Sequence, residues 1–249
     1  WEERDAEACG RDPGPRPRVF CASLADWLDA EVPVAWLFDL LDLIRRTPHL
    51  DWLLLSKRPE NFDRLVKEAQ IRAEETGNEL LDHWLTLWLN DVPPANVWIG
   101  TTAESQEWAD RRIPELLKIP ARIRFISAEP LLGRVDLTSP LLSGGIHWVI
   151  CGGESGPAAR PMHPGWARFL RDQCALAKVP FHFKQWGEWA DPDAAGFELQ
   201  TCRGPDGQTA ASIDGRRPAI MRDGLARAGK HVAGRRLDGR EHNEFPLAA

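Results

Sequence analysis

Polar and charged side chains stand directly after most of the apolar runs in this chain of 249 residues. Each run has the length of a buried strand, so these side chains mark the points where strands are expected to end. In folds of parallel strands, the carboxyl ends gather at one edge, where the loops are free to carry function. The residues at these positions are Ser23, Asp26, Ser56, Lys57, Arg58, Thr101, Thr102, Glu104, Ser127, Glu129, Glu154, Ser155, Arg160, Lys184, Gln185 and Trp186.

The stretch VICGGESGPAARP predicts a loop that holds a ligand. Its β-branched residues stop at Gly152 and Gly153, and the next helix is expected only near Pro164, which is more chain than a simple reversal needs. Successive glycines let backbone N–H groups turn toward one point and form a concavity for an anion. Glu154 and Arg160 would then hold the other polar atoms of the ligand. A plain turn is the alternative interpretation.

Three other strand ends could complete such a site. Lys57 and Arg58 can clamp a carboxylate or phosphate, or they can simply cap the next helix. Glu129 precedes a proline that disfavours helical backbone, so its carboxylate is expected to point across the strand ends, as a ligand group or in an ion pair. Trp186 can stack on a planar ligand or cover the core. The residues predicted to bind a ligand are Lys57, Arg58, Glu129, Gly152, Gly153, Glu154, Ser155, Arg160, Lys184, Gln185 and Trp186.

Several familiar catalytic motifs do not occur in the sequence. It contains no Gly-x-Ser-x-Gly elbow, no Walker loop and no His-Glu-x-x-His, and its seven histidines are scattered. His163 is the one histidine near the predicted loop, and its place before Pro164 is typical of a residue at a helix entry. We therefore assign neither a catalytic residue nor a metal ligand.

Hydrophobic periodicity predicts the elements that must position these residues. Short apolar runs alternate with amphipathic helical patterns, and within one of these patterns Pro114 marks a break or a fresh start. Such alternation indicates βαβ units with parallel pairing, hence the α/β class. The predicted strands span residues 18–23, 50–59, 96–102, 121–132, 145–153 and 179–187, and the predicted helices span 34–46, 60–77, 78–94, 105–120 and 164–178.

About six parallel strands fit either a (β/α) barrel, full or partial, or an open doubly wound sheet. No Gly-x-Gly-x-x-Gly follows the first strand, and this absence favours the barrel. We expect an irregular N-terminal segment at residues 1–18, a barrel-like domain at 19–186 and an irregular C-terminal extension at 187–249 packed on the barrel. Residues 228–246 of the extension have the pattern of a hairpin laid over the core.

Composition limits the classes of function. A net charge of −6 and a pI near 5.7 argue against a generally basic, nucleic-acid-coating surface. Five cysteines at irregular spacing form neither a disulfide framework nor a zinc ribbon. With no apolar run of membrane-spanning length and no targeting pattern, we interpret the protein as cytoplasmic. The chain begins at Trp1 and not at Met, so we expect that a segment precedes it.

The C-terminal extension is locally basic. The stretch from Arg216 to Arg240 contains eight lysines and arginines and two aspartates, which gives a local charge of +6. This segment is either a solvated surface or a phosphate-binding one. The basic residues are Arg216, Arg217, Arg222, Arg227, Lys230, Arg235, Arg236 and Arg240.

Several motifs resemble one known family when they are read in order. The stretches NVWIGTTAESQEWADRRIPELL, RFISAEPLLG, HWVICGGESGPAARPMHP, VPFHFKQWGEW and GKHVAGRRLDGREHNEFP resemble the phage-associated three-cysteine-motif family, a radical-SAM-like group of unknown function. The resemblance runs from about Val19 to Pro246 and implies a partial (β/α) barrel. For full-length members it also implies an N-terminal strand and three cysteines, the last two spaced CxxC, that hold a 4Fe–4S cluster for S-adenosylmethionine.

This chain lacks that cysteine segment, because Cys9 and Cys21 are too far apart to replace it. We therefore expect no cofactor in this chain, and no catalytic role carries over to Glu154 or any other residue. The leading hypothesis is the truncated body of a radical-SAM-like enzyme of unknown substrate, a small molecule or a nucleic acid. The alternative is a non-catalytic, phage-associated module that engages nucleic acid or a partner protein through the basic segment. A third hypothesis is a cluster-free lyase or hydrolase that uses Glu129 and Glu154 as acid and base.

Overall fold

The computed structural model describes residues 16–21, 25–204, 207–216 and 218–246. Its fold is α/β, as predicted, with six parallel strands in a curled half-barrel sheet followed by small antiparallel sheets. The strands run β1 (Arg18–Cys21), β2 (Asp51–Ser56), β3 (Val97–Thr102), β4 (Ile123–Ala128), β5 (Trp148–Gly152) and β6 (Phe181–Gln185), and their order in the sheet is their order in the chain. Sequential neighbours of this kind need a crossover between each pair of strands, which explains the alternating pattern.

The chain divides into two compact units. The first comprises the described residues up to Thr101 together with residues 111–125, and the second comprises residues 102–110 and 126–246. Residues 187–246 therefore belong to the same unit as β5 and β6, and the domain boundary expected after residue 186 stays a prediction.

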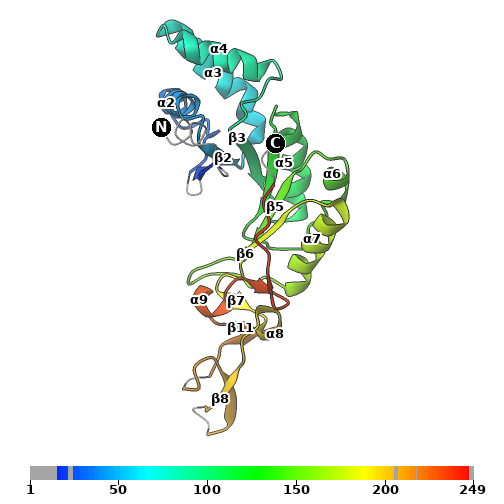
Figure 1. Cartoon of the computed structure of the whole chain (residues 1–249). Coiled ribbons are helices and arrows are strands. Elements are labelled where there is room, and N and C mark those ends of the chain that lie inside the picture. Colours follow the sequence, from blue (N-terminus) through cyan, green and yellow to red (C-terminus); the bar gives the residue numbers. More distant parts are fainter. Residues whose placement is uncertain (1–15, 22–24, 205–206, 217, 247–249) are drawn as a thin grey trace, which may run out of the picture. The chain divides into compact units, whose positions relative to one another are not determined.

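The first unit is built around β1, β2 and β3. Trp52 to Ser56 of β2 pair in parallel with Val97 to Thr101 of β3. The helices are α2 (Val34–Arg46), α3 (Phe62–Glu75) and α4 (Glu79–Leu89), and α3 and α4 lie side by side (Figure 1). Their apolar faces are buried, including Leu41, Val66 and Trp88, which are fully shielded from solvent.

Helix α5 (Gln106–Lys118) differs from the prediction at Pro114. We expected a break or a new start there, but one helix runs through the proline. Proline removes one backbone hydrogen bond, yet Ile113 and Leu116 are buried on either side, and this burial holds the turn in place.

In the second unit, β5 and β6 pair in parallel and α7 (Pro164–Ala177) packs against both, as Figure 1 shows. Leu170 and Cys174 of α7 and Phe183 of β6 are fully buried. The short helix α6 (Thr138–Leu142) lies in the connection between β4 and β5, where no helix was predicted.

The C-terminal extension, expected to be irregular, contains short antiparallel pairs (Figure 1). Strands β10 (Met221–Arg222), β11 (Leu225–Arg227) and β7 (Trp189–Ala190) form one sheet, and β8 (Gln200–Arg203) pairs with β9 (Thr209–Ser212). Strands β12 (Arg236–Leu237) and β13 (Arg240–Glu241) form a hairpin within the segment where we expected one. The remaining elements are η1 (Pro59–Asn61), α8 (Pro192–Ala195) and α9 (Lys230–Ala233).

The last described residues run antiparallel to β6. Phe183 N donates to His242 O at 3.0 Å, and Phe181 N donates to a side-chain oxygen of Glu244 at 3.1 Å. Trp148 Nε1 donates to Glu244 O at 2.9 Å. This segment therefore satisfies backbone donors along β6 that a bare sheet edge would leave open.

Some predictions fall on residues outside the described ranges: the N-terminal segment up to residue 15 with Cys9, and also Ser23 and Arg217. In the described part of the chain, every helix is too short or too polar to cross a membrane.

Candidate functional site

Glu129 directly follows β4 and is a largely buried carboxylate of the second unit. Its side chain is only 15% exposed, and Lys184 Nζ reaches it from β6 at 3.3 Å from Oε1 and 3.4 Å from Oε2. Ser127 Oγ donates to Oε2 at 3.4 Å. Burial raises the pKa of Glu129, and the charge of Lys184 only partly opposes this effect. All of these contacts are longer than ordinary hydrogen bonds, so the carboxylate is poorly satisfied.

Gly152 allows Glu129 to lie where it does. A Cβ atom built on Gly152 would overlap Glu129 Oε1, so the carboxylate rests against the bare backbone at the end of β5. Cys151, the neighbouring residue on this strand, is buried, and burial together with the charge of Glu129 raises the pKa of its thiol. The structure thus brings together Glu129, Gly152 and Lys184 from the ends of β4, β5 and β6.

Gly153 has a packing role. A Cβ atom there would collide with the carbonyl oxygen of Trp186, and one on Gly187, at φ +86°, would collide with Glu154 O. Gly153 N donates to Gln185 O at 2.9 Å, so this amide is already engaged within the protein. Its predicted use in binding an anion stays a prediction. Gly187 is a further close-contact glycine that we did not single out, since a lone glycine after a strand is common.

Glu154 and Arg160 bind each other across the loop. Arg160 donates from Nε to Oε2 at 2.9 Å, from Nη2 to Oε1 at 3.0 Å and from its backbone N to Oε2 at 2.8 Å. These bonds lower the pKa of Glu154. Beside them, Gln185 Nε2 donates to Ser155 Oγ at 3.1 Å. The loop is thus closed by its own side chains, and Gln185 ties it to β6.

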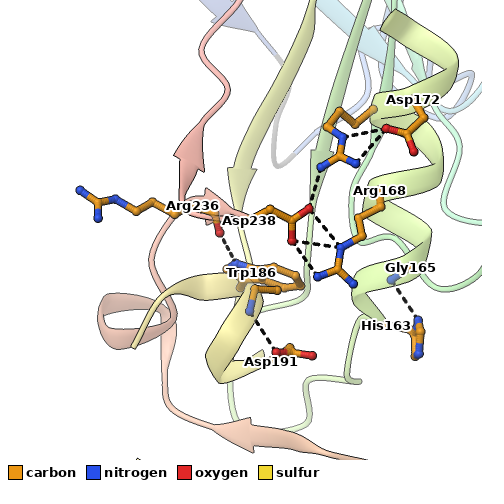
Figure 2. A network of polar contacts seen from close by, with 10 residues as sticks. His163, Gly165, Arg168, Asp172, Trp186, Asp191, Arg236 and Asp238 are labelled. Carbon is orange, nitrogen blue, oxygen red and sulfur yellow. Dashed lines mark hydrogen bonds and ion pairs between the residues drawn. The ribbon is translucent and has the colours of Figure 1, made fainter. Parts of the chain in front are cut away.

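Trp186 is 1% exposed, and its indole N–H donates to Arg236 O at 2.7 Å. This geometry supports the interpretation of Trp186 as a cover over the core. Figure 2 shows the same region with Asp238, whose carboxylate accepts two bonds from Arg168 Nε and one from Nη2, at 2.7–3.1 Å, and one from Arg171 Nη1 at 2.7 Å. Asp238 and the two arginines of α7 escaped sequence analysis, because nothing local links residues this far apart.

His163 caps α7. Its Nδ1 accepts from Gly165 N at 3.0 Å, as Figure 2 shows, in agreement with a residue at a helix entry.

Lys57 and Arg58 belong to the first unit, at the carboxyl end of β2. The backbone N of Lys57 donates to Asp26 Oδ2 at 2.9 Å, and Arg58 Nη1 lies 3.1 Å from Asp26 Oδ2 and 3.2 Å from Asp29 Oδ2. Arg58 therefore holds the loop after β1 against the end of β2. Their predicted role in ligand binding stays a prediction.

The basic segment is partly neutralised by carboxylates outside it. Arg227 pairs with Glu188 at 3.4 Å, Arg235 with Glu241 at 3.5 Å and Arg240 with Glu244 at 3.2 Å. The charge of +6 read along the sequence therefore overstates the field that this surface presents.

The described residues contain no group of three or more His, Cys, Asp or Glu that could hold a metal ion. The described cysteines, Cys21, Cys151, Cys174 and Cys202, form no such group, whereas the thiolates that hold an iron–sulfur cluster lie close together. The residues that the structure describes therefore do not fit an iron–sulfur cluster.

One family model matches the chain over residues 5–246, and its description is "Protein of unknown function (DUF5131)". The chain belongs to this family. The match confirms that the sequence is that of an uncharacterised family over nearly its whole length. Neither a curated protein nor a solved structure matches the chain.

Proposed function

We propose that this chain is the substrate-binding body of a radical-SAM-like enzyme of phage-associated origin, and that its second unit holds a polar substrate at the carboxyl ends of β4, β5 and β6. The observation that carries the proposal is the environment of Glu129: its carboxylate is only 15% exposed, and no charged or hydroxyl donor among the described residues lies closer to it than 3.3 Å. Buried carboxylates normally have better partners, and strained electrostatics of this kind concentrate at functional sites.

The chemistry available at this edge follows from three side chains. Glu129, with its raised pKa, can hold a proton or accept a hydrogen bond from a substrate. Lys184 is 56% exposed at its side chain and can donate to a substrate oxygen while it contacts Glu129. Ser127 adds a hydroxyl on the same carboxylate. Glu154 and Arg160 shape the adjacent loop in this proposal.

The cluster ligands of such an enzyme would have to come from outside the described residues, because the described cysteines do not fit that role. When bound, a cluster of this kind supplies electrons to S-adenosylmethionine. In this proposal, the residues at the ends of β4, β5 and β6 position the substrate.

The gene upstream of the codon for Trp1 tests the proposal directly. We expect an in-frame segment with three cysteines, the last two spaced CxxC. Protein expressed with that segment and reconstituted anaerobically with ferrous iron and sulfide should gain the broad visible absorption of a 4Fe–4S cluster and bind S-adenosylmethionine. An upstream sequence without such cysteines, or a reconstituted protein that stays colourless, would refute the proposal of a radical-SAM-like enzyme.

A further inference from the structure

The pair formed by Glu129 and Lys184 has unused hydrogen-bonding capacity on both partners. A carboxylate can accept about four hydrogen bonds, and among the described residues Glu129 has only the long contacts from Ser127 and Lys184. An ammonium has three donors, and within the part of the chain that the structure describes Lys184 meets one acceptor group, the carboxylate of Glu129. A ligand at this edge would therefore meet a donor and an acceptor side by side, 3.3 Å apart.

The backbone holds the acceptor in place. Glu129 Oε1 lies against Gly152, where a side chain would displace it, and Gly152 O in turn accepts from Leu131 N at 2.9 Å. The ends of β4 and β5 are thus tied together around the carboxylate. Lys184 is the more accessible partner, with a long side chain that is more than half exposed.

Charge decides which ligands fit. An anion beside the buried carboxylate of Glu129 would be repelled, and a cation beside Lys184 would be repelled in turn. A neutral group that presents an acceptor and a donor along one edge avoids both repulsions. A primary carboxamide and a lactam have this arrangement, because their C=O accepts while an N–H on the same side of the C–N bond donates, whereas in a trans amide the two groups point in opposite directions.

We infer that Glu129 and Lys184 form a binding site for an amide edge, either a carboxamide or the lactam edge of a nucleobase. The N–H of the ligand donates to the Glu129 carboxylate, and its C=O accepts from the Lys184 ammonium. This inference rests on the proposed function for the location of the site, and it names the chemistry of the substrate that binds there.

The test uses the chain as it is, with two probes, uracil and nicotinamide, titrated by ligand-observed NMR. Each probe has a matched control in which methyl groups replace the N–H hydrogens: 1,3-dimethyluracil and N,N-dimethylnicotinamide. We expect at least one probe to bind, and its methylated form to bind at least about tenfold more weakly, because the carboxylate loses a charge-assisted hydrogen bond. Binding of uracil alone indicates a nucleobase edge, and binding of nicotinamide alone indicates an open carboxamide.

Variants locate the binding. Glu129→Gln and Lys184→Met should each weaken the bound probe at least about tenfold. Gly152→Ala keeps both charges but displaces the carboxylate, and it should have the same effect. Glu68→Gln and Lys67→Met change exposed ion-paired residues of α3 and should leave binding unchanged.

Three outcomes overturn the inference: no binding of either probe, equal binding of a probe and its methylated form, or binding of ribose or inorganic phosphate in their place. None of these measurements needs a cluster. Probe binding would therefore uphold the inference even if no cysteine segment exists. A protein that forms a cluster but binds neither probe would refute this inference and leave the proposed function standing.

Discussion

Two glutamates that follow neighbouring strands of the second unit have opposite electrostatic states. Glu154, after β5, accepts three bonds of 2.8–3.0 Å from Arg160, and its pKa is lowered. Glu129, after β4, has contacts of 3.3–3.4 Å with Ser127 and Lys184, and its pKa is raised by burial. The partner of Glu154 lies six residues away in the same loop, whereas that of Glu129 comes from another strand.

The difference separates a residue that holds the structure from one that is available to a ligand. The carboxylate oxygens of Glu154 accept hydrogen bonds from Arg160 that close their own loop, and these bonds fix the path of the chain after Gly153. Glu129 keeps unused acceptors in a buried place, at a cost in desolvation that local structure does not offset. Sequence position alone ranks the two residues equally, and only their partners distinguish them.

The largest effect is expected from a substitution in the loop that contains Glu154. Gly153→Ala should lower the free energy of unfolding by about 3 kcal/mol or more, because the added methyl meets the backbone carbonyl of Trp186, which cannot move freely. Gly133→Ala is the matched control: a Cβ atom there has open space, and the change should stay within about 0.5 kcal/mol. Chemical denaturation of both variants measures the difference. Equal stabilities would mean that the double glycine does not serve packing.

The fold was more predictable than the site because strands and helices leave local periodic signals. The alternation of apolar runs indicated six parallel strands, and the residues after each strand could be read directly. The hydrogen-bond and ion-pair partners of these residues could not be predicted from the sequence. Trp186 finds Arg236 O fifty residues away, and Asp238 meets Arg168 seventy residues away. These contacts depend on tertiary packing, which no spacing in the sequence encodes.

The role of a glycine was also hidden. Gly152 and Gly153 look alike in the sequence, but one makes room for Glu129 and the other for the backbone of Trp186. Pro114 shows the converse, since a strong local signal for a helix break was overridden by burial of its neighbours.

Asp238 extends the class of well-satisfied carboxylates beyond Glu154. Asp238→Asn should cost about 1 kcal/mol, a value kept small by the partial exposure of the residues involved. Asp223→Asn is the control, since Asp223 also precedes a glycine at positive φ but pairs with Arg222 at a distance of 3.9 Å. Asparagine tolerates this backbone, so the turn is kept in both variants. Equal thermal midpoints for the two variants would show that the contact of Asp238 with α7 adds nothing.

The ionisation of the buried Glu129 can be tested through the pH dependence of stability. Because the pKa of Glu129 is raised in the folded state, protonation favours folding: this contribution is complete below the unfolded value near 4.5 and is lost as pH rises through the folded pKa. Glu129→Gln should therefore remove a gain in stability on acidification that the wild type shows. Denaturant titrations at several pH values, with Glu68→Gln as control, measure it. A wild-type profile that coincides with that of Glu129→Gln would contradict the raised pKa.

The smallest effect, with the opposite sign, is expected at Glu154. Its pKa is lowered by Arg160, so its contribution to stability is present above the unfolded value near 4.5 and disappears as pH falls through the folded pKa. Glu154→Gln should reduce stability slightly at neutral pH and not at all in acid, since the ion pair is largely exposed and solvent screens it. The two glutamine variants should thus change the pH profile in opposite directions, although each removes one glutamate after a parallel strand. If both shifted the profile the same way, the difference in partners would not govern their ionisation, and the case for Glu129 as the ligand group would lose its physical basis.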